Sequence, residues 1–220
     1  MKIQFHKYQG AGNDFVMIDN REGQFDKSNL LLIQQLCDRR FGVGSDGLIL
    51  IENHDSLDFN MIYYNSDGSQ SFCGNGSRCA IAFTNRLGMI SKNTSFNSTD
   101  GEHEGVFATE KEIHLNMHDV ADVEKGENFF YMNTGSPHYI KYVDDVDAVD
   151  ILKEAHQIRY NNRFKEEGVN VNFVQILSND KLKIRTYERG VENETLACGT
   201  GVTAAAISFM VQSNGAETIE

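Results

Sequence analysis

The sequence lacks any apolar stretch long enough to cross a membrane, and it has no apolar leader at its start. The longest near-candidate, Gly201 to Val211, has 11 residues, whereas a membrane-spanning helix needs about 18 or more. The opening residues MKIQFHKYQG do not contain the apolar core of a secretory signal. We therefore expect a cytoplasmic protein with no membrane partner.

Positive charge is also scarce. Lys and Arg number 20 against 32 Asp and Glu, which gives a formal net charge of −12. Because nucleic-acid binding normally needs a basic face, we expect no nucleic-acid partner. A small anionic substrate is not excluded, since a few backbone N–H groups and one arginine reverse the field locally. The 220 residues suffice for one large domain or two small ones.

Cysteine and proline are rare. The four cysteines form no C-x-x-C pair, and no histidine stands at metal-ligand spacing from them. We therefore expect no metal site, no disulfide framework and free thiols in a reducing compartment. Cys37 and Cys79 fit apolar helical positions and are expected in the core.

Pro137 is the only proline. Its rigid backbone predicts a fixed direction for His138, a candidate supporting residue for a catalytic thiol.

One short motif occurs twice in the sequence. Cys73-Gly74-Asn75-Gly76 and Cys198-Gly199-Thr200-Gly201 lie 125 residues apart, and each opens an apolar run. A thiol before a Gly-x-Gly turn and a helix stands at the positive end of the helix dipole, where a thiolate and a bound anion are both stabilised. Two opposed bases invert a carbon centre in one pass. The repeat predicts two half-domains, each contributing one acid/base cysteine to a shared cleft.

The apolar pattern predicts a similar order of elements in residues 1–117 and 118–220, divided by an acidic, unpatterned stretch. In the first half we expect strands at 2–7, 14–19, 48–51 and 58–64, a helix from Ser28 as N-cap to about Arg39, a turn at 65–68, and a motif helix stopped at Gly88. In the second half we expect strands at 129–132, 171–177 and 181–187, a helix near 149–159, a loop at 188–197, and the second motif helix.

These elements predict an α/β (α+β) fold of two pseudo-symmetric half-domains. Each is expected to be a rolled, mostly antiparallel sheet around a central helix, with the active site in the cleft between them. The chain continues much further after the first motif than after the second. We therefore expect the second half to lack its last strands, and we interpret Asn214-Gly215 as a turn into a new strand.

The motifs together resemble the diaminopimelate epimerases. The resemblance covers nearly the whole chain and lies in GAGNDF at 10–15, RRFGVGSDGL at 39–48, YNSDGS at 64–69, CGNGSRC at 73–79, GSPH at 135–138, NVNF at 170–173, YERG at 187–190 and CGTG at 198–201. It implies an enzyme that needs no cofactor and interconverts L,L- and meso-diaminopimelate on the route to lysine and peptidoglycan. It also suggests a homodimer.

The resemblance further implies roles for single residues. Cys73 would act on the L centre and Cys198 on the D centre, with the reacting carboxylate held at Gly74-Asn75 and Gly199-Thr200. The other implied substrate-binding residues are Asn13, Asn65, Ser136, Asn170, Glu188 and Arg189. Amides beside a Glu-Arg pair supply the donors and acceptors that a distal amino acid end needs. Ser136 stands where asparagine is frequent in the family, and its hydroxyl reaches less far.

Three other interpretations remain open at this point. A proline or hydroxyproline racemase-like enzyme would use the same two thiols without a pocket for a distant amino acid end, which the asparagine set and Glu188-Arg189 argue against. An isomerase of the phenazine-biosynthesis type shares the implied fold but lacks the paired thiols. A redox sensor or ligand-binding module would use Cys73 and Cys198 as a switchable disulfide.

Asp46 and Asp67 precede glycines in turns and are interpreted as structural.

Overall fold

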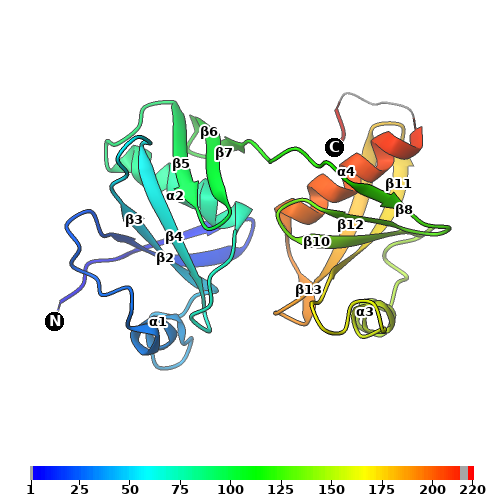
Figure 1. The fold of residues 1–220 in the computed structure, drawn as a ribbon, viewed down its shortest axis with the longest axis horizontal. Coiled ribbons are helices and arrows are strands. Elements are labelled where there is room, and N and C mark those ends of the chain that lie inside the picture. Colours follow the sequence, from blue (N-terminus) through cyan, green and yellow to red (C-terminus); the bar gives the residue numbers. More distant parts are fainter. Residues whose placement is uncertain (1, 214–217) are drawn as a thin grey trace. The chain divides into compact units, whose positions relative to one another are not determined.

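The computed structural model describes residues 2–213 and 218–220, which divide into two compact units, Met1–Met117 and His118–Glu220 (Figure 1). Each unit is a curled sheet with two helices, which confirms the expected α+β fold of two similar halves. Among the described residues no helix is both long and apolar enough to cross a membrane.

Unit 1 is built on a seven-stranded sheet whose strands follow one another in chain order. They are β1 (His6–Gly10), β2 (Asn13–Asp19), β3 (Gly47–Glu52), β4 (Phe59–Asn65), β5 (Asn93–Ser98), β6 (Gly101–Thr109) and β7 (Glu112–Leu115). The pairs β2·β3 and β4·β5 are parallel and the other four are antiparallel. Helix α1 (Leu30–Cys37) lies between β2 and β3 in the chain, and α2 (Gly74–Arg86) follows β4.

The two helices cover opposite faces of this sheet. Phe15 and Met17 of β2 belong to the core that includes α2, while Val16 and Ile18 belong to the core that includes α1. Successive side chains of a strand point to opposite faces, so a strand buried on both sides is a continuous apolar run. Cys79 packs in the first core and Cys37 in the second, as expected.

Unit 2 repeats the central part of this arrangement in a six-stranded sheet of order β13-β12-β11-β10-β9-β8. Its strands are β8 (Val123–Lys125), β9 (Phe130–Asn133), β10 (Pro137–Tyr142), β11 (Asn170–Ser178), β12 (Lys181–Glu188) and β13 (Asn193–Thr195). Among the strand pairs that the structure describes in this unit, β10·β11 is parallel and the other four are antiparallel. Helix α3 (Ile151–Arg159) lies between these two strands in the chain, and α4 (Gly199–Ser213, red in Figure 1) packs on the other face of the sheet.

Several predicted boundaries were wrong. The N-cap of α1 is Asn29, whose side chain accepts from the Leu32 N–H, whereas the Ser28 hydroxyl donates to Asp26. The first strand begins at His6 rather than at residue 2. Strand β10 was not predicted, and β8 and β13 lie in stretches interpreted as unpatterned or loop. The turn at Asn214-Gly215 lies outside the described residues; beyond it, the backbone of Glu220 pairs with Asp180 and Leu182 along β12.

Candidate active site

In unit 1, Cys73 caps the helix that its motif was expected to open. Its backbone is extended (φ −137°, ψ 105°), and its sulfur accepts from the Gly76 N–H at 3.4 Å. Gly74 and Asn75 form the start of α2, where N–H groups have no carbonyl partner within their own helix. The structure therefore combines a half-buried thiol with a helix N-terminus suited to a carboxylate.

The side chain of Asn13 reaches the same thiol from the start of β2. Its Oδ1 lies 3.6 Å from the Cys73 sulfur and 3.4 Å from Asn75 Nδ2. Its Nδ2 donates to Asp46 Oδ2 at 2.7 Å. A carboxylate oxygen only accepts hydrogen bonds, so the amide is oriented with Nδ2 toward Asp46 and its oxygen toward Cys73. The thiol proton of Cys73 is thus provided with an acceptor.

Asp46 is itself held by charge. Arg39 donates to Asp46 at 2.7 Å and to Asp14 at 2.6 Å, and Lys7 pairs with Asp14 at 2.7 Å. Burial raises the pKa of Asp14, but hydrogen bonds from Arg39 and Lys7 outweigh it and bring this pKa down to about 2. Asp46 therefore has a structural role: its carboxylate orients the side-chain amide of Asn13, a predicted substrate-binding residue.

Asn65 lies at the end of β4, before the loop that leads to Cys73. Its Nδ2 donates to Ser69 and to the Ser71 hydroxyl, and its Oδ1 accepts from the Tyr63 hydroxyl at 2.9 Å. Asp67 binds the Ser69 N–H within the same turn at 2.8 Å, as expected for a turn aspartate. Substrate contact by Asn65 would have to replace part of this bonding.

In unit 2, Cys198 immediately precedes α4 and its sulfur lies 3.4 Å from the Thr200 hydroxyl. Burial and the charge of Glu188 raise the pKa of the Cys198 thiol, against the hydrogen bond from Thr200 and those from the backbone of Gly201 and Thr200. The backbone N–H groups at the helix start therefore act as expected and lower the pKa of this thiol, but burial and the charge of Glu188 outweigh them.

His138 lies fully buried behind Thr200. Its Nε2 is 2.8 Å from the Thr200 hydroxyl, and its Nδ1 is 3.0 Å from Nδ2 of Asn172. Burial lowers the pKa of His138 to about 3, and the charge of Arg189 acts in the same direction. The ring is therefore neutral at physiological pH, and hydrogen bonds through Thr200 link it to Cys198.

Asn170 links two other predicted residues of unit 2, Ser136 and Arg189. Its Nδ2 donates to the Ser136 hydroxyl at 3.0 Å, and its Oδ1 accepts from the Arg189 N–H at 2.9 Å. The Arg189 guanidinium donates to the Glu167 carbonyl at 2.7 Å. Glu188 ends β12 next to Arg189, and Gly199 is the first residue of α4. The structure thus groups the predicted residues of this half around the start of α4.

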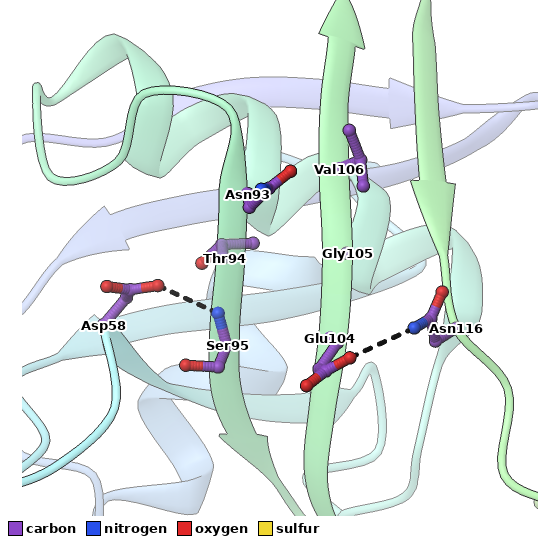
Figure 2. A pocket seen from close by; sticks show the side chains of 8 residues that line it. All are labelled: Asp58, Asn93, Thr94, Ser95, Glu104, Gly105, Val106 and Asn116. Atoms are coloured by element: carbon purple, nitrogen blue, oxygen red, sulfur yellow. Dashed lines mark hydrogen bonds between the residues drawn. The ribbon is translucent and has the colours of Figure 1, made fainter.

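A separate surface cavity of about 370 Å³ contains none of the predicted site residues (Figure 2). It lies along β5 and β6, where Asp58 bonds to the Ser95 N–H and Glu104 bonds to Asn116. Within residues 2–213 and 218–220 no cluster of three or more His, Cys, Asp or Glu side chains could hold a metal ion.

Sequence reasoning missed the residues that orient the site rather than form it. Asn172 is the clearest case: it is fully buried on the face of β11 that also carries Asn170. The signal was present, since two asparagines two residues apart in an apolar strand share one face. Arg39 and Thr186 belong to the same class of supporting residues.

Comparison with known proteins gives one family. The family model described as diaminopimelate epimerase matches residues 5–121 and 130–220. A diaminopimelate epimerase of Flavobacterium psychrophilum is 51% identical over 208 residues, which covers 94% of this chain and 81% of the relative. A diaminopimelate epimerase of Chlorobaculum tepidum is 44% identical over 206 residues, covering 90% and 80%.

Solved structures resemble the chain in fold at much lower identity. A phenazine biosynthesis protein of the PhzF family from Bacillus anthracis superposes with a TM-score of 0.68 at 12% identity, covering 96% of this chain and 81% of that one. A probable proline racemase from Agrobacterium radiobacter with bound carbonate gives a TM-score of 0.66 at 13% identity, covering 98% and 79%. A fold alone does not fix a function, so this similarity concerns architecture.

Proposed function

The chain belongs to the diaminopimelate epimerase family and is an amino-acid epimerase of the isomerase class, and we propose that it converts L,L-diaminopimelate to meso-diaminopimelate with Cys73 and Cys198 as its two bases. The observation that carries this proposal is the matched pair of thiols at the starts of α2 and α4. The PhzF-family protein and the probable proline racemase resemble this chain in fold at 12% and 13% identity, so this similarity supports neither of those two interpretations.

In the proposed reaction one sulfur, as thiolate, takes the α-proton. The C–H electron pair passes toward the α-carboxylate, and the negative charge is stabilised by the N–H groups at a helix N-terminus. The other sulfur, as thiol, donates its proton to the opposite face of the same carbon. One proton is lost and one is gained, so no oxidant, reductant or cofactor is needed. Each turnover exchanges the thiol and thiolate forms of the two cysteines.

The polar groups around the two cysteines fall into two proposed sets, one for the reacting carboxylate and one for the distal end of the substrate. Gly74-Asn75 and Gly199-Thr200 would hold the reacting carboxylate. The distal amino acid end would bind to the amides and to the Glu-Arg pair that surround them. These residues are Asn13, Asn65, Ser136, Asn170, Glu188 and Arg189. His138 would support Cys198 through Thr200, to which it is hydrogen-bonded.

The proposal includes a cellular setting. The four cysteines are free thiols, which suits the reducing cytoplasm. Meso-diaminopimelate would supply lysine and peptidoglycan synthesis there. A homodimer, suggested by the family resemblance, is part of the same proposal, and the molecular mass in solution tests it.

The first prediction concerns the two cysteines. Cys73→Ala and Cys198→Ala should each lower kcat for inversion by about 10²–10⁴-fold, the usual contribution of a general acid or base. Chiral separation of L,L- and meso-diaminopimelate measures this. Cys37→Ala, which changes a buried core thiol of unit 1, should retain turnover. Near-normal turnover by either single active-site variant would refute the two-base scheme.

A further inference from the structure

We propose that Asn172 is a positioning residue for Cys198: it fixes the neutral ring of His138 so that the ring donates to Thr200, and the Thr200 hydroxyl in turn donates to the Cys198 sulfur. The inference rests on the proposed role of Cys198 as a base. It assigns a function to a residue that makes no contact with the thiol itself.

The orientation of the Asn172 amide follows from two of its hydrogen bonds. Nδ2 lies 3.1 Å from the carbonyl oxygen of Tyr139, and Oδ1 accepts from the Thr186 hydroxyl at 2.9 Å. A backbone carbonyl is only an acceptor, so the NH₂ group must face Tyr139 and the amide oxygen must face Thr186. Two acceptors remain for the second proton of the NH₂ group, His138 Nδ1 at 3.0 Å and the Asn170 carbonyl at 3.5 Å, and the shorter distance assigns it to His138 Nδ1.

This orientation determines which ring nitrogen of His138 carries the proton. Nδ1 accepts from Asn172, so it has no proton of its own. The ring is neutral, because burial lowers the pKa of His138 to about 3, and a neutral imidazole carries one N–H. That N–H is therefore on Nε2, 2.8 Å from the Thr200 hydroxyl oxygen. Asn170 Nδ2 is more distant from Nε2, at 3.4 Å, and makes its shorter hydrogen bond, of 3.0 Å, to Ser136.

The Thr200 hydroxyl completes the sequence of donors. Its oxygen accepts from His138, so its own proton is directed to the Cys198 sulfur, 3.4 Å away. Such a donor stabilises the thiolate, and it acts against the burial and the Glu188 charge that raise the pKa of Cys198. The charged groups near this network are Glu188 beside the thiol and Arg189 beside the ring.

Close packing keeps the network in place. A Cβ added at Gly201 would lie 2.6 Å from Asn172 Oδ1 and 3.3 Å from His138 Cε1. Glycine at this motif position therefore lets α4 approach the amide and the ring. The polar residues of this network are all buried, so water does not compete for their hydrogen bonds. They are His138, Asn172, Thr186 and Thr200.

The test measures the thiol directly and needs no turnover. The pH dependence of iodoacetamide alkylation is recorded for Cys198 and Cys73 in the same sample by peptide mass spectrometry. Thr200→Val keeps the side-chain shape but removes the hydroxyl, and Asn172→Ala removes the anchor of the ring. Both should move the Cys198 profile upward by about one pH unit, the order expected for loss of one hydrogen bond to a charged group. Thr200→Ser should restore the original profile.

Cys73 lies in the other unit and is the internal control, with an unchanged profile in every variant. In the unmodified chain, ¹⁵N NMR of His138 should show a protonated Nε2 and an unprotonated Nδ1. A protonated Nδ1, or a Cys198 profile unaffected by Thr200→Val, would overturn the inference. If Asn172→Ala does not fold, the Val/Ser pair and the NMR measurement still decide it. A shifted profile in a protein that does not invert diaminopimelate would support the network while refuting the proposed function.

Discussion

At the scale of single residues, two buried or half-buried amides give the two cysteines opposite neighbours. Asp46 orients Asn13 so that an acceptor oxygen faces Cys73. Asn172 orients His138 so that the hydroxyl donor of Thr200 faces Cys198. An acceptor favours the protonated form of a thiol and a donor favours the thiolate. Asn13 therefore favours the thiol form of Cys73 and Thr200 favours the thiolate form of Cys198, which are the forms from which the proposed reaction runs in the meso to L,L direction.

The charges that hold Asn13 lead to a prediction about acid stability. Asp14 has a pKa of about 2 in the folded protein against an ordinary value of 3.8, because hydrogen bonds from Arg39 and Lys7 outweigh its burial. A carboxyl whose pKa is lowered on folding contributes stability above its ordinary pKa and loses it as the pH falls through the folded value. Asp14→Asn should therefore be less stable than the parent at pH 6, with a difference that shrinks toward pH 2.

Urea unfolding of both proteins at a series of pH values measures this difference. The ion pair of Asp19, the last residue of β2, with Arg21, two residues further along the chain, offers a matched control. Asp19→Asn changes another partly exposed carboxylate without touching Asn13 and should leave substrate binding intact. A difference in unfolding free energy between Asp14→Asn and the parent that stays the same from pH 6 to pH 2 would contradict this prediction.

At the scale of elements, the repeated motif and the helices that it opens could be predicted from the sequence. A cysteine before Gly-x-Gly and an apolar run is a local pattern, and both α2 and α4 begin at the first glycine of this pattern. Strand β10 could not be found in the same way. His138 is a fully buried polar residue at its second position, so the alternation of apolar and polar residues that identifies a strand is hidden by the site.

The two motif glycines next to the helix starts provide an element-scale prediction. Alanine at Gly76 would meet the flexible ends of Ile49 and Met61, at 3.0 and 3.3 Å, whereas alanine at Gly201 would meet the fixed amide of Asn172 at 2.6 Å. Gly201→Ala should lower the free energy of unfolding by about 1–3 kcal/mol. Gly76→Ala should change it by less than about 1 kcal/mol, because the helix gains propensity. Equal effects of the two substitutions in thermal unfolding would count against this account of α4 packing.

At the scale of the whole molecule, both units contain the order strand, strand, helix, strand, strand, with a parallel pair around the first helix; the second helix follows directly in unit 1 and after one more strand, β13, in unit 2. The duplicated motif and the apolar runs predicted much of this repetition, but they did not predict β10, the strand that pairs with β11 in unit 2. It did not predict the polarity around each cysteine, which depends on side chains from several strands: Asp46 follows α1, while Asn172 lies on β11. Such contacts between distant segments leave no short pattern in the chain.

The central claim is that Cys73 and Cys198 act on opposite faces of one carbon, and isotope exchange tests it most directly. The protein is incubated with L,L-diaminopimelate in heavy water, and substrate and product are analysed by mass spectrometry and NMR at low conversion. The account predicts one deuterium at the inverted α-carbon of the meso product and almost none in recovered L,L substrate, because the base that removes the proton does not return it. Equal label in recovered substrate and product, or product without label, would contradict it.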